Sequence, residues 1–120
     1  MSNRGLSGGG GVFRETLELM ILQSLAALGS LHGYAIAARL EEVSAGAVRV
    51  DMGTLYPALM RLEQRGLVRA AWGTTGKNRK AKFYTITAAG QRRLAAETAE
   101  WWDRALSITK AVLNLATTKI

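Results

Sequence analysis

The sequence has no cysteine, one histidine and one proline. Without cysteine there are no disulfides, no thiolate metal ligands and no cysteine nucleophile. His32 alone cannot form a protein-only zinc site of the usual type, which needs several His or Cys ligands. The acidic residues are spaced for helix-surface ion pairs rather than for paired-carboxylate catalysis. We therefore expect a protein that is not an enzyme and that uses no metal and no cofactor.

Long apolar runs are also missing. Stretches such as residues 19–22 are among the longest, whereas a membrane span needs about 20 residues. The start of the chain lacks the pattern of a secretory signal. Apolar residues make up 48% of the chain and charged residues 21%, the usual mix of a globular protein. These features predict one folded domain in the cytoplasm, with no membrane contact.

Acidic residues are scarce in the middle of the chain. The net charge is +7, from 16 Lys and Arg against 9 Asp and Glu. Residues 49–82 hold eight of the basic and two of the acidic side chains, which gives this stretch a charge of +6. A solvated surface kept for solubility predicts a more even spread. The concentration favours a face that binds a polyanion such as nucleic acid.

The first part of the chain divides into a tail and two helices. Residues 1–11 include four consecutive glycines, which predicts a flexible tail. From Phe13 to Leu28, apolar residues recur at spacings of three and four, as on one face of a helix. A second helix is expected from Gly33 to about Ser44, with His32 before it as a capping or packing residue.

A third helix is expected to begin at a cap formed by Asp51 or Thr54. Pro57 fits its first turn, and Gly66 ends it. Its inward stripe is leucine, whereas its outward face is small or polar apart from one methionine. That outward face could approach a ligand closely.

Two strand-like segments follow, at residues 67–72 and 80–87. The turn between them has two glycines and two cations, so the hairpin has a basic tip. We expect Trp72 to pack in the core or within the hairpin. The order of the elements matches a winged helix-turn-helix, a mainly α fold with a small β-hairpin, in which the third helix is the recognition helix.

The last segment predicts one long helix with Thr87 as its N-cap. Apolar positions recur at alternating spacings of four and three from residue 94 to residue 115, as in a coiled-coil seam. Such a helix is longer than the domain it belongs to, and its overhanging apolar face needs a partner. We therefore predict a tail at 1–11, a winged domain at 12–87 and a dimerisation helix at 88–120.

Three blocks of sequence resemble the PadR family of bacterial transcription regulators. They are Leu-His-Gly-Tyr-Ala-Ile at 31–36, Gly-Thr-Leu-Tyr-Pro-Ala-Leu at 53–59 and Phe-Tyr-Thr-Ile-Thr at 83–87. The likeness spans roughly residues 13–90, and the single C-terminal helix resembles the short subgroup of that family. The resemblance implies a homodimer built from the first and last helices. It also implies binding to double-stranded operator DNA, usually as a repressor relieved by a small molecule.

The expected DNA contacts lie on the third helix and on the wing. In this arrangement the helix enters the major groove and the wing cations meet phosphates or the minor groove. The candidate residues are Gly53, Thr54, Tyr56, Pro57, Arg61, Gln64, Lys77, Arg79, Lys80 and Lys82. Arg65 lies towards the inner flank, where a salt bridge is the alternative role.

The expected dimer or effector interface is apolar. Its candidate residues are Phe13, Leu17, Trp101, Trp102, Ala105, Ile108 and Val112. The paired tryptophans either fill the dimer core or stack on a small, flat aromatic effector.

Two other functions fit a winged helix. A protein–protein interaction module would usually have a less basic wing and a weaker dependence on salt. An RNA-binding module would favour exposed aromatic side chains that stack on unpaired bases, for which the basic stretch offers Tyr56 and Trp72.

Overall fold

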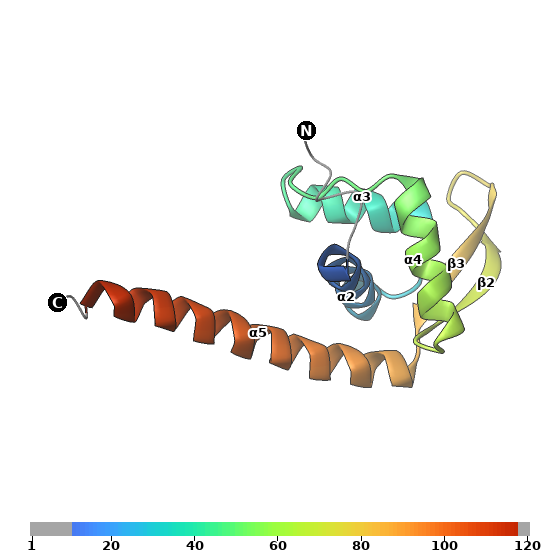
Figure 1. Cartoon of the computed structure of the whole chain (residues 1–120). Coiled ribbons are helices and arrows are strands. Elements are labelled where there is room, and N and C mark those ends of the chain that lie inside the picture. The colour runs from blue at the N-terminus through green and yellow to red at the C-terminus, as the bar shows by residue number, and fades with distance from the viewer. Residues whose placement is uncertain (1–10, 118–120) are drawn as a thin grey trace.

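The computed structural model describes the backbone of residues 11–117 and the side chains of residues 14–115. A small helical body carries a hairpin at one end and a long projecting helix (Figure 1). The elements are, in chain order, α2 (Gly11–Leu28), β1 (Leu31–His32), α3 (Gly33–Val43), α4 (Met52–Gln64), β2 (Val68–Thr74), β3 (Lys80–Ile86) and α5 (Ala88–Thr117). The predicted winged helix-turn-helix with a long C-terminal helix is confirmed. The predicted tail lies outside the described residues except for Gly11, where α2 begins.

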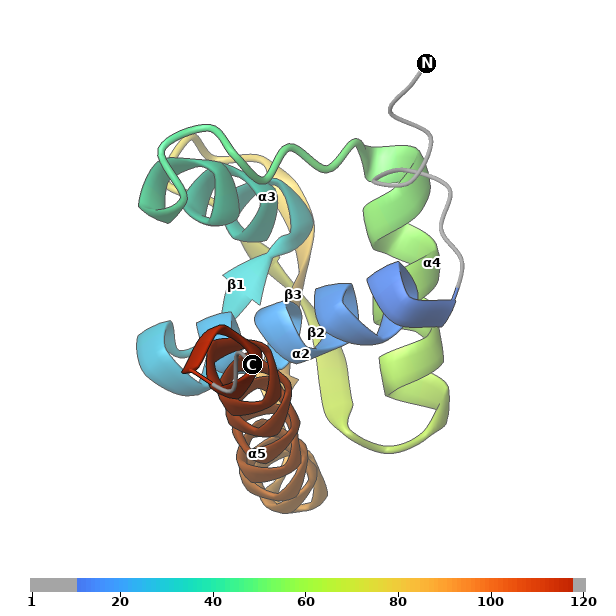
Figure 2. The same ribbon diagram turned by 60° about the vertical axis from the view of Figure 1, so that its left-hand side comes forward.

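The core forms around α2, which lies between α3, α4 and α5 (Figure 2). Its apolar stripe is buried from Leu17 to Leu25, as are the inward leucines of α4, whereas Leu28 at the end of α2 is 45% exposed. The buried apolar side chains are Leu17, Ile21, Leu22, Leu25, Ile36, Leu40, Leu55, Ala58, Leu59, Leu62, Leu67, Val68, Tyr84, Ile86 and Leu94. Removing these groups from water is the main stabilising term of so small a domain. The leucine side of α4 therefore packs on the core, and its opposite side faces solvent.

The sheet has three strands in the order β1-β3-β2, all antiparallel. β1 was not predicted, because two residues are too short to show an alternating pattern. It pairs Leu31 with Tyr84 and His32 with Phe83. His32 also caps α3, since its Nδ1 accepts a hydrogen bond from the backbone N–H of Ala35 at 3.3 Å. This histidine is thus a capping residue, as expected.

The first turns of α5 pack on the body, and its later turns project beyond it (Figure 1). Thr87 caps it, because its hydroxyl oxygen accepts from the backbone N–H of Gly90 at 3.0 Å. Leu94 is buried in the core, whereas most side chains from Ala99 onwards are exposed. The helix has 30 residues, which corresponds to about 45 Å at the usual rise. Among the described residues, no helix combines the length and the hydropathy needed to cross a membrane.

Candidate nucleic-acid interface

α4 begins one turn earlier than the alternative cap at Thr54 would place it. Asp51 is the N-cap, and its carboxylate accepts from the backbone N–H of Thr54 at 2.9 Å. Pro57 is therefore inside the helix rather than in its first turn, which corrects the prediction. Because proline has no N–H, the carbonyl of Gly53 loses its partner four residues on. Both residues are exposed.

Gly53 stands out among the described glycines. A Cβ there would meet only the Asp51 carboxylate, at an ordinary contact distance of 3.4 Å, and its backbone is not left-handed. By contrast, Gly33, Gly73 and Gly90 lack room for a Cβ. Glycine inside a helix is less stable than alanine by roughly 0.5–1 kcal/mol. Within the described residues no close contact requires a glycine here, so the start of α4 simply lacks a side chain at this position.

Tyr56 lies across the start of α3. A Cβ on Gly33 would fall 2.9 Å from the tyrosine hydroxyl oxygen and 3.0 Å from the ring, so the glycine makes room for it. Tyr56 is nevertheless 40% exposed. Its ring is thus fixed against the body while part of it faces solvent beside α4.

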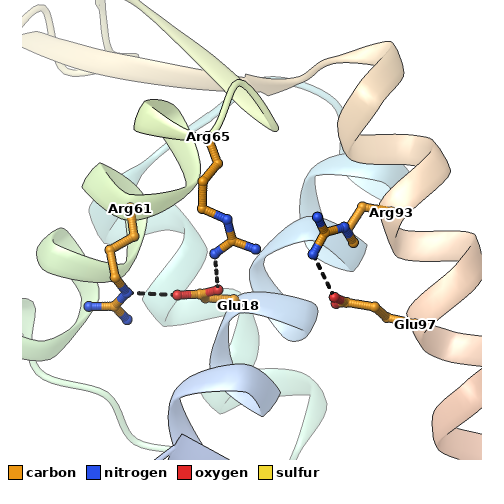
Figure 3. A network of polar contacts seen from close by, with 5 residues as sticks. All are labelled: Glu18, Arg61, Arg65, Arg93 and Glu97. Atoms are coloured by element: carbon orange, nitrogen blue, oxygen red, sulfur yellow. Dashed lines mark hydrogen bonds and ion pairs between the residues drawn. The ribbon is translucent and has the colours of Figure 1, made fainter.

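Arg61 does not lie free on the outer side of α4, which corrects its predicted place. Its Nε donates to the carboxylate of Glu18 in α2 at 2.7 Å, and Arg65 donates to the other oxygen at 2.8 Å (Figure 3). The Glu18 side chain is only 10% exposed. Arg65 is therefore the salt-bridge partner that the sequence suggested, and Arg61 is a second one. Glu18 was missed, although its spacing to Leu22 and Leu25 places a carboxylate on the apolar stripe.

The wing carries its cations at the tip. Thr75 shapes the turn, because its hydroxyl oxygen accepts from the backbone N–H groups of Lys77 and Arg79, both at 3.2 Å. Lys77, Arg79 and Lys80 are exposed, and within residues 14–115 none of them forms an ion pair with a carboxylate. Lys82 differs, since its Nζ lies 3.9 Å from the Glu63 carboxylate of α4. Three wing cations are therefore available to an anion, and the fourth bridges to α4.

Trp72 is exposed, which corrects the expectation that it packs in the core or the hairpin. Its exposed fraction is 71%, and it lines a hollow of about 1100 Å³ between the wing and α4. The hollow also exposes Tyr34, Tyr56 and Met60. Tyr84 forms part of its wall; burial raises the pKa of this tyrosine, and Glu63 and then Tyr56 add to the shift. Its hydroxyl therefore stays protonated at neutral pH.

The projecting helix exposes the predicted apolar seam. Trp101 and Trp102 contact each other edge to face, with ring centroids 5.1 Å apart and an interplanar angle of 88°. Trp101, Ile108 and Val112 are 46%, 59% and 61% exposed, whereas Ala105 is half-buried. Leu17 belongs to the core at 1% exposure, so its predicted place in an interface is wrong. The side chain of Phe13 lies outside the described ones.

In the part of the chain that the structure describes, no three His, Asp or Glu side chains lie close enough together to hold a metal ion.

Comparison with known proteins gives a family match. The model of the family described as "Transcriptional regulator PadR-like family" matches residues 21–96, which is more than half of the chain. That range includes α3, α4, the wing and the first turns of α5. The matched family consists of transcriptional regulators, not enzymes.

Solved structures of transcriptional regulators agree with this match, and two curated but uncharacterised proteins are also similar to the chain. A transcriptional regulator from Clostridium thermocellum is 28% identical with a TM-score of 0.70, over 88% of this chain and 96% of that one. A PadR-family regulator from Eggerthella lenta is 29% identical with a TM-score of 0.71, over 82% and 83%. An uncharacterised protein X of Lysinibacillus sphaericus is 28% identical over 75% of this chain and 82% of its own. An uncharacterised 37.1 kDa transposon protein of Streptomyces fradiae is 42% identical over 67% of this chain, which spans only 21% of that protein.

Proposed function

This chain belongs to the PadR-like family of transcriptional regulators, and from that premise we propose that it is a homodimeric, sequence-specific DNA-binding repressor that a small aromatic effector releases from its operator. Bacterial operators lie in the cytoplasm, so the proposal implies a cytoplasmic protein. The observation that carries it is the position of two surfaces at opposite ends of the molecule (Figure 1). The wing and the exposed side of α4 lie at one end, and the free end of α5 lies at the other.

In this proposal α4 enters the major groove with its exposed side foremost. Gly53 and Pro57 would allow close approach, and Thr54 and Tyr56 would contact phosphates. Gln64 is exposed and can read or position a base edge. The structural support for this orientation is that the other side of α4 is buried against α2. Arg61 and Arg65 are left out of the base-reading set, because Glu18 binds both.

The wing supplies charge rather than sequence information. Lys77, Arg79 and Lys80 would neutralise phosphates of the same duplex, with Lys82 behind them. Two wings per dimer then give a steep dependence of affinity on salt. The support is that Lys77, Arg79 and Lys80 are exposed and form no ion pair with a carboxylate within residues 14–115.

The dimer would form along α5. Exposed apolar groups follow this helix beyond the body, and water disfavours such a surface. They are Trp101, Trp102, Leu106, Ile108, Val112, Leu113 and Leu115, between 46% and 71% exposed. A two-fold dimer covers this face on both chains at once. The tryptophan pairs of the two protomers would then flank the effector, which explains why an aromatic compound is the ligand we propose.

Fluorescence anisotropy tests the function directly. The duplex from upstream of this protein's own gene is titrated beside a scrambled duplex at two salt concentrations, and bound sequences are also selected from a pool of random duplexes. We expect either a clear preference for the upstream duplex or enrichment of an inverted repeat from the pool. Equal, weak binding to every duplex, with no enrichment, would contradict the proposal.

A further inference from the structure

The inner face of the wing continues the core outwards and ends in a tryptophan. In the β2–β3 register, Val68 lies opposite Ile86 and Ala70 opposite Tyr84. Val68, Ile86 and Tyr84 are buried. Residues two apart on a strand share a face, so the next pair, Trp72 and Lys82, lies on that same inner face. Here the helices no longer cover it, and Trp72 is 71% exposed.

The opposite wall of this hollow is α4. Tyr56 and Met60 line it and are 40% and 57% exposed. The Lys82–Glu63 pair joins wing and helix, with 3.9 Å between Nζ and the carboxylate oxygen. The hollow is thus bounded by the helix that we propose for the major groove and by the wing that we propose for phosphates. It is large enough, at about 1100 Å³, to admit a nucleotide unit.

The chemistry of the hollow suits a sugar–phosphate chain. Lys77, Arg79 and Lys80 line it without carboxylate partners in residues 14–115, and Glu63 is the acidic residue among its lining. An anion is therefore favoured in it. An exposed indole among cations adds an apolar surface for a part of the ligand that carries no charge. Phosphates and deoxyribose rings alternate along a DNA strand in this way.

We propose that the hollow holds one strand of the duplex, with the indole of Trp72 packed on a deoxyribose while the wing cations contact the flanking phosphates. This inference rests on the proposed function, because a strand that borders the major groove must pass between α4 and the wing. Trp72 then contributes affinity that does not come from charge. It adds a contact that salt does not weaken.

The test separates apolar contact from charge. Affinity of the full chain for its duplex is measured at several salt concentrations for the wild type, Trp72→Ala, Trp72→Phe and the double variant Lys77→Ala with Arg79→Ala. We expect Trp72→Ala to lower affinity about tenfold at every salt concentration, which corresponds to about 1.4 kcal/mol. Its slope of log affinity against log salt stays that of the wild type, whereas the double variant has a shallower slope. Trp72→Phe recovers part of the loss.

Two controls test whether the effect of Trp72→Ala is specific to the hollow and independent of folding. Val43→Ala removes an exposed apolar side chain far from the hollow and should leave affinity unchanged. Circular dichroism should give Trp72→Ala the melting temperature of the wild type, since an exposed side chain adds little to the fold. Tryptophan emission should also be quenched when duplex is added to the wild type, and less so in Trp72→Phe.

Each contrary outcome has its own meaning. If the wild type binds duplex and Trp72→Ala binds equally well, the hollow does not hold the strand, and the proposed function stands. A change of salt slope in Trp72→Ala equal to that of the double variant also overturns the inference, because Trp72 would then act by placing the cations. Stronger quenching of Trp72 by single-stranded RNA than by duplex assigns the hollow to base stacking instead. If no duplex is bound specifically, the proposed function itself fails.

Discussion

Gly53 is the residue at which stability and binding oppose each other most clearly. Most of the glycines between residues 29 and 90 have an internal reason, either a left-handed backbone, as at Gly29 and Gly66, or a neighbour where a Cβ would stand. Gly76 has neither, but it lies in the turn of the wing rather than in a helix. Gly53 is within α4 with room for a methyl group. The sequence alone suggested close approach here, and the open space around the glycine supports that reading.

Gly53→Ala should therefore make the protein more stable and a weaker DNA binder. We expect the free energy of unfolding to rise by about 0.5 kcal/mol, from the better helix propensity of alanine. Affinity for the operator duplex should fall about tenfold, and Gly53→Ser should lose more because its side chain is larger. Thermal melting and anisotropy measure the two effects. Operator binding by both variants at wild-type strength would show that α4 does not approach DNA at this point.

Glu18 is a charged residue on the buried side of α2, bound by Arg61 of α4 and by Arg65, the C-cap of that helix. Its partners are 31% and 42% exposed, so they can return to water when the carboxylate is removed. The loss is therefore smaller than the roughly 3–5 kcal/mol typical of a fully buried pair. We expect Glu18→Ala to lower the free energy of unfolding by about 1–2 kcal/mol, measured by denaturant titration.

Glu97→Ala is the matched control for Glu18→Ala. It breaks the neighbouring Arg93–Glu97 pair, 3.0 Å long and exposed on both sides, which Figure 3 shows beside the Glu18 cluster. An exposed pair of this kind contributes less than about 0.5 kcal/mol. Equal effects of the two substitutions would mean that the Glu18 cluster is no more than a surface ion pair.

At the scale of elements, the order of helices and wing follows from the sequence because each element has a strong local signal. Apolar periodicity marks α2 and α5, and caps or glycines mark the helix ends. Local signals do not show which residues from distant parts of the chain come into contact. The pairing of β1 with β3, the binding of Arg61 by Glu18 and the exposure of Trp72 all depend on residues distant in sequence. The sequence thus predicted the helix and the cations of the candidate site. It did not predict the hollow between α4 and the wing.

The wing should act through charge, and a double substitution tests it. We expect Lys77→Ala with Arg79→Ala to weaken binding to operator and scrambled duplex alike. Each lost phosphate contact lowers the salt slope by about 0.9. The oligomeric state should not change, because the tip lies at the end of the molecule away from the free end of α5 (Figure 1).

The control for the wing removes equal charge elsewhere. Arg92→Ala with Lys110→Ala takes two exposed cations from α5 and should leave the salt slope close to that of the wild type. If the wing variant keeps the wild-type slope, or if both double variants lower it equally, general charge rather than the wing tip governs binding.

At the scale of the whole molecule, the shape supports the proposed dimer. The molecule extends 65 Å along its longest axis and 22 Å along its shortest, since α5 projects beyond the body. Its exposed seam would be covered by the same seam of a two-fold partner, and a dimer would set two copies of α4 against two half-sites. Dimerisation and operator affinity are then linked, because a monomer holds one half-site only.

A carboxylate in the middle of the seam should weaken dimerisation and operator binding without unfolding the winged domain. Ile108→Glu places a charge on a face that we propose is buried between protomers, where an unpaired charge is strongly disfavoured. We expect sedimentation to show a shift from dimer to monomer, operator affinity to fall at least about tenfold, and the winged domain to keep its melting transition. Lys110→Glu adds the same group two residues away, off the seam, and should remain dimeric. A fully dimeric Ile108→Glu would mean that α5 contacts its partner through another face. A monomeric variant that binds operator as tightly as the wild type would show that operator binding does not depend on the dimer.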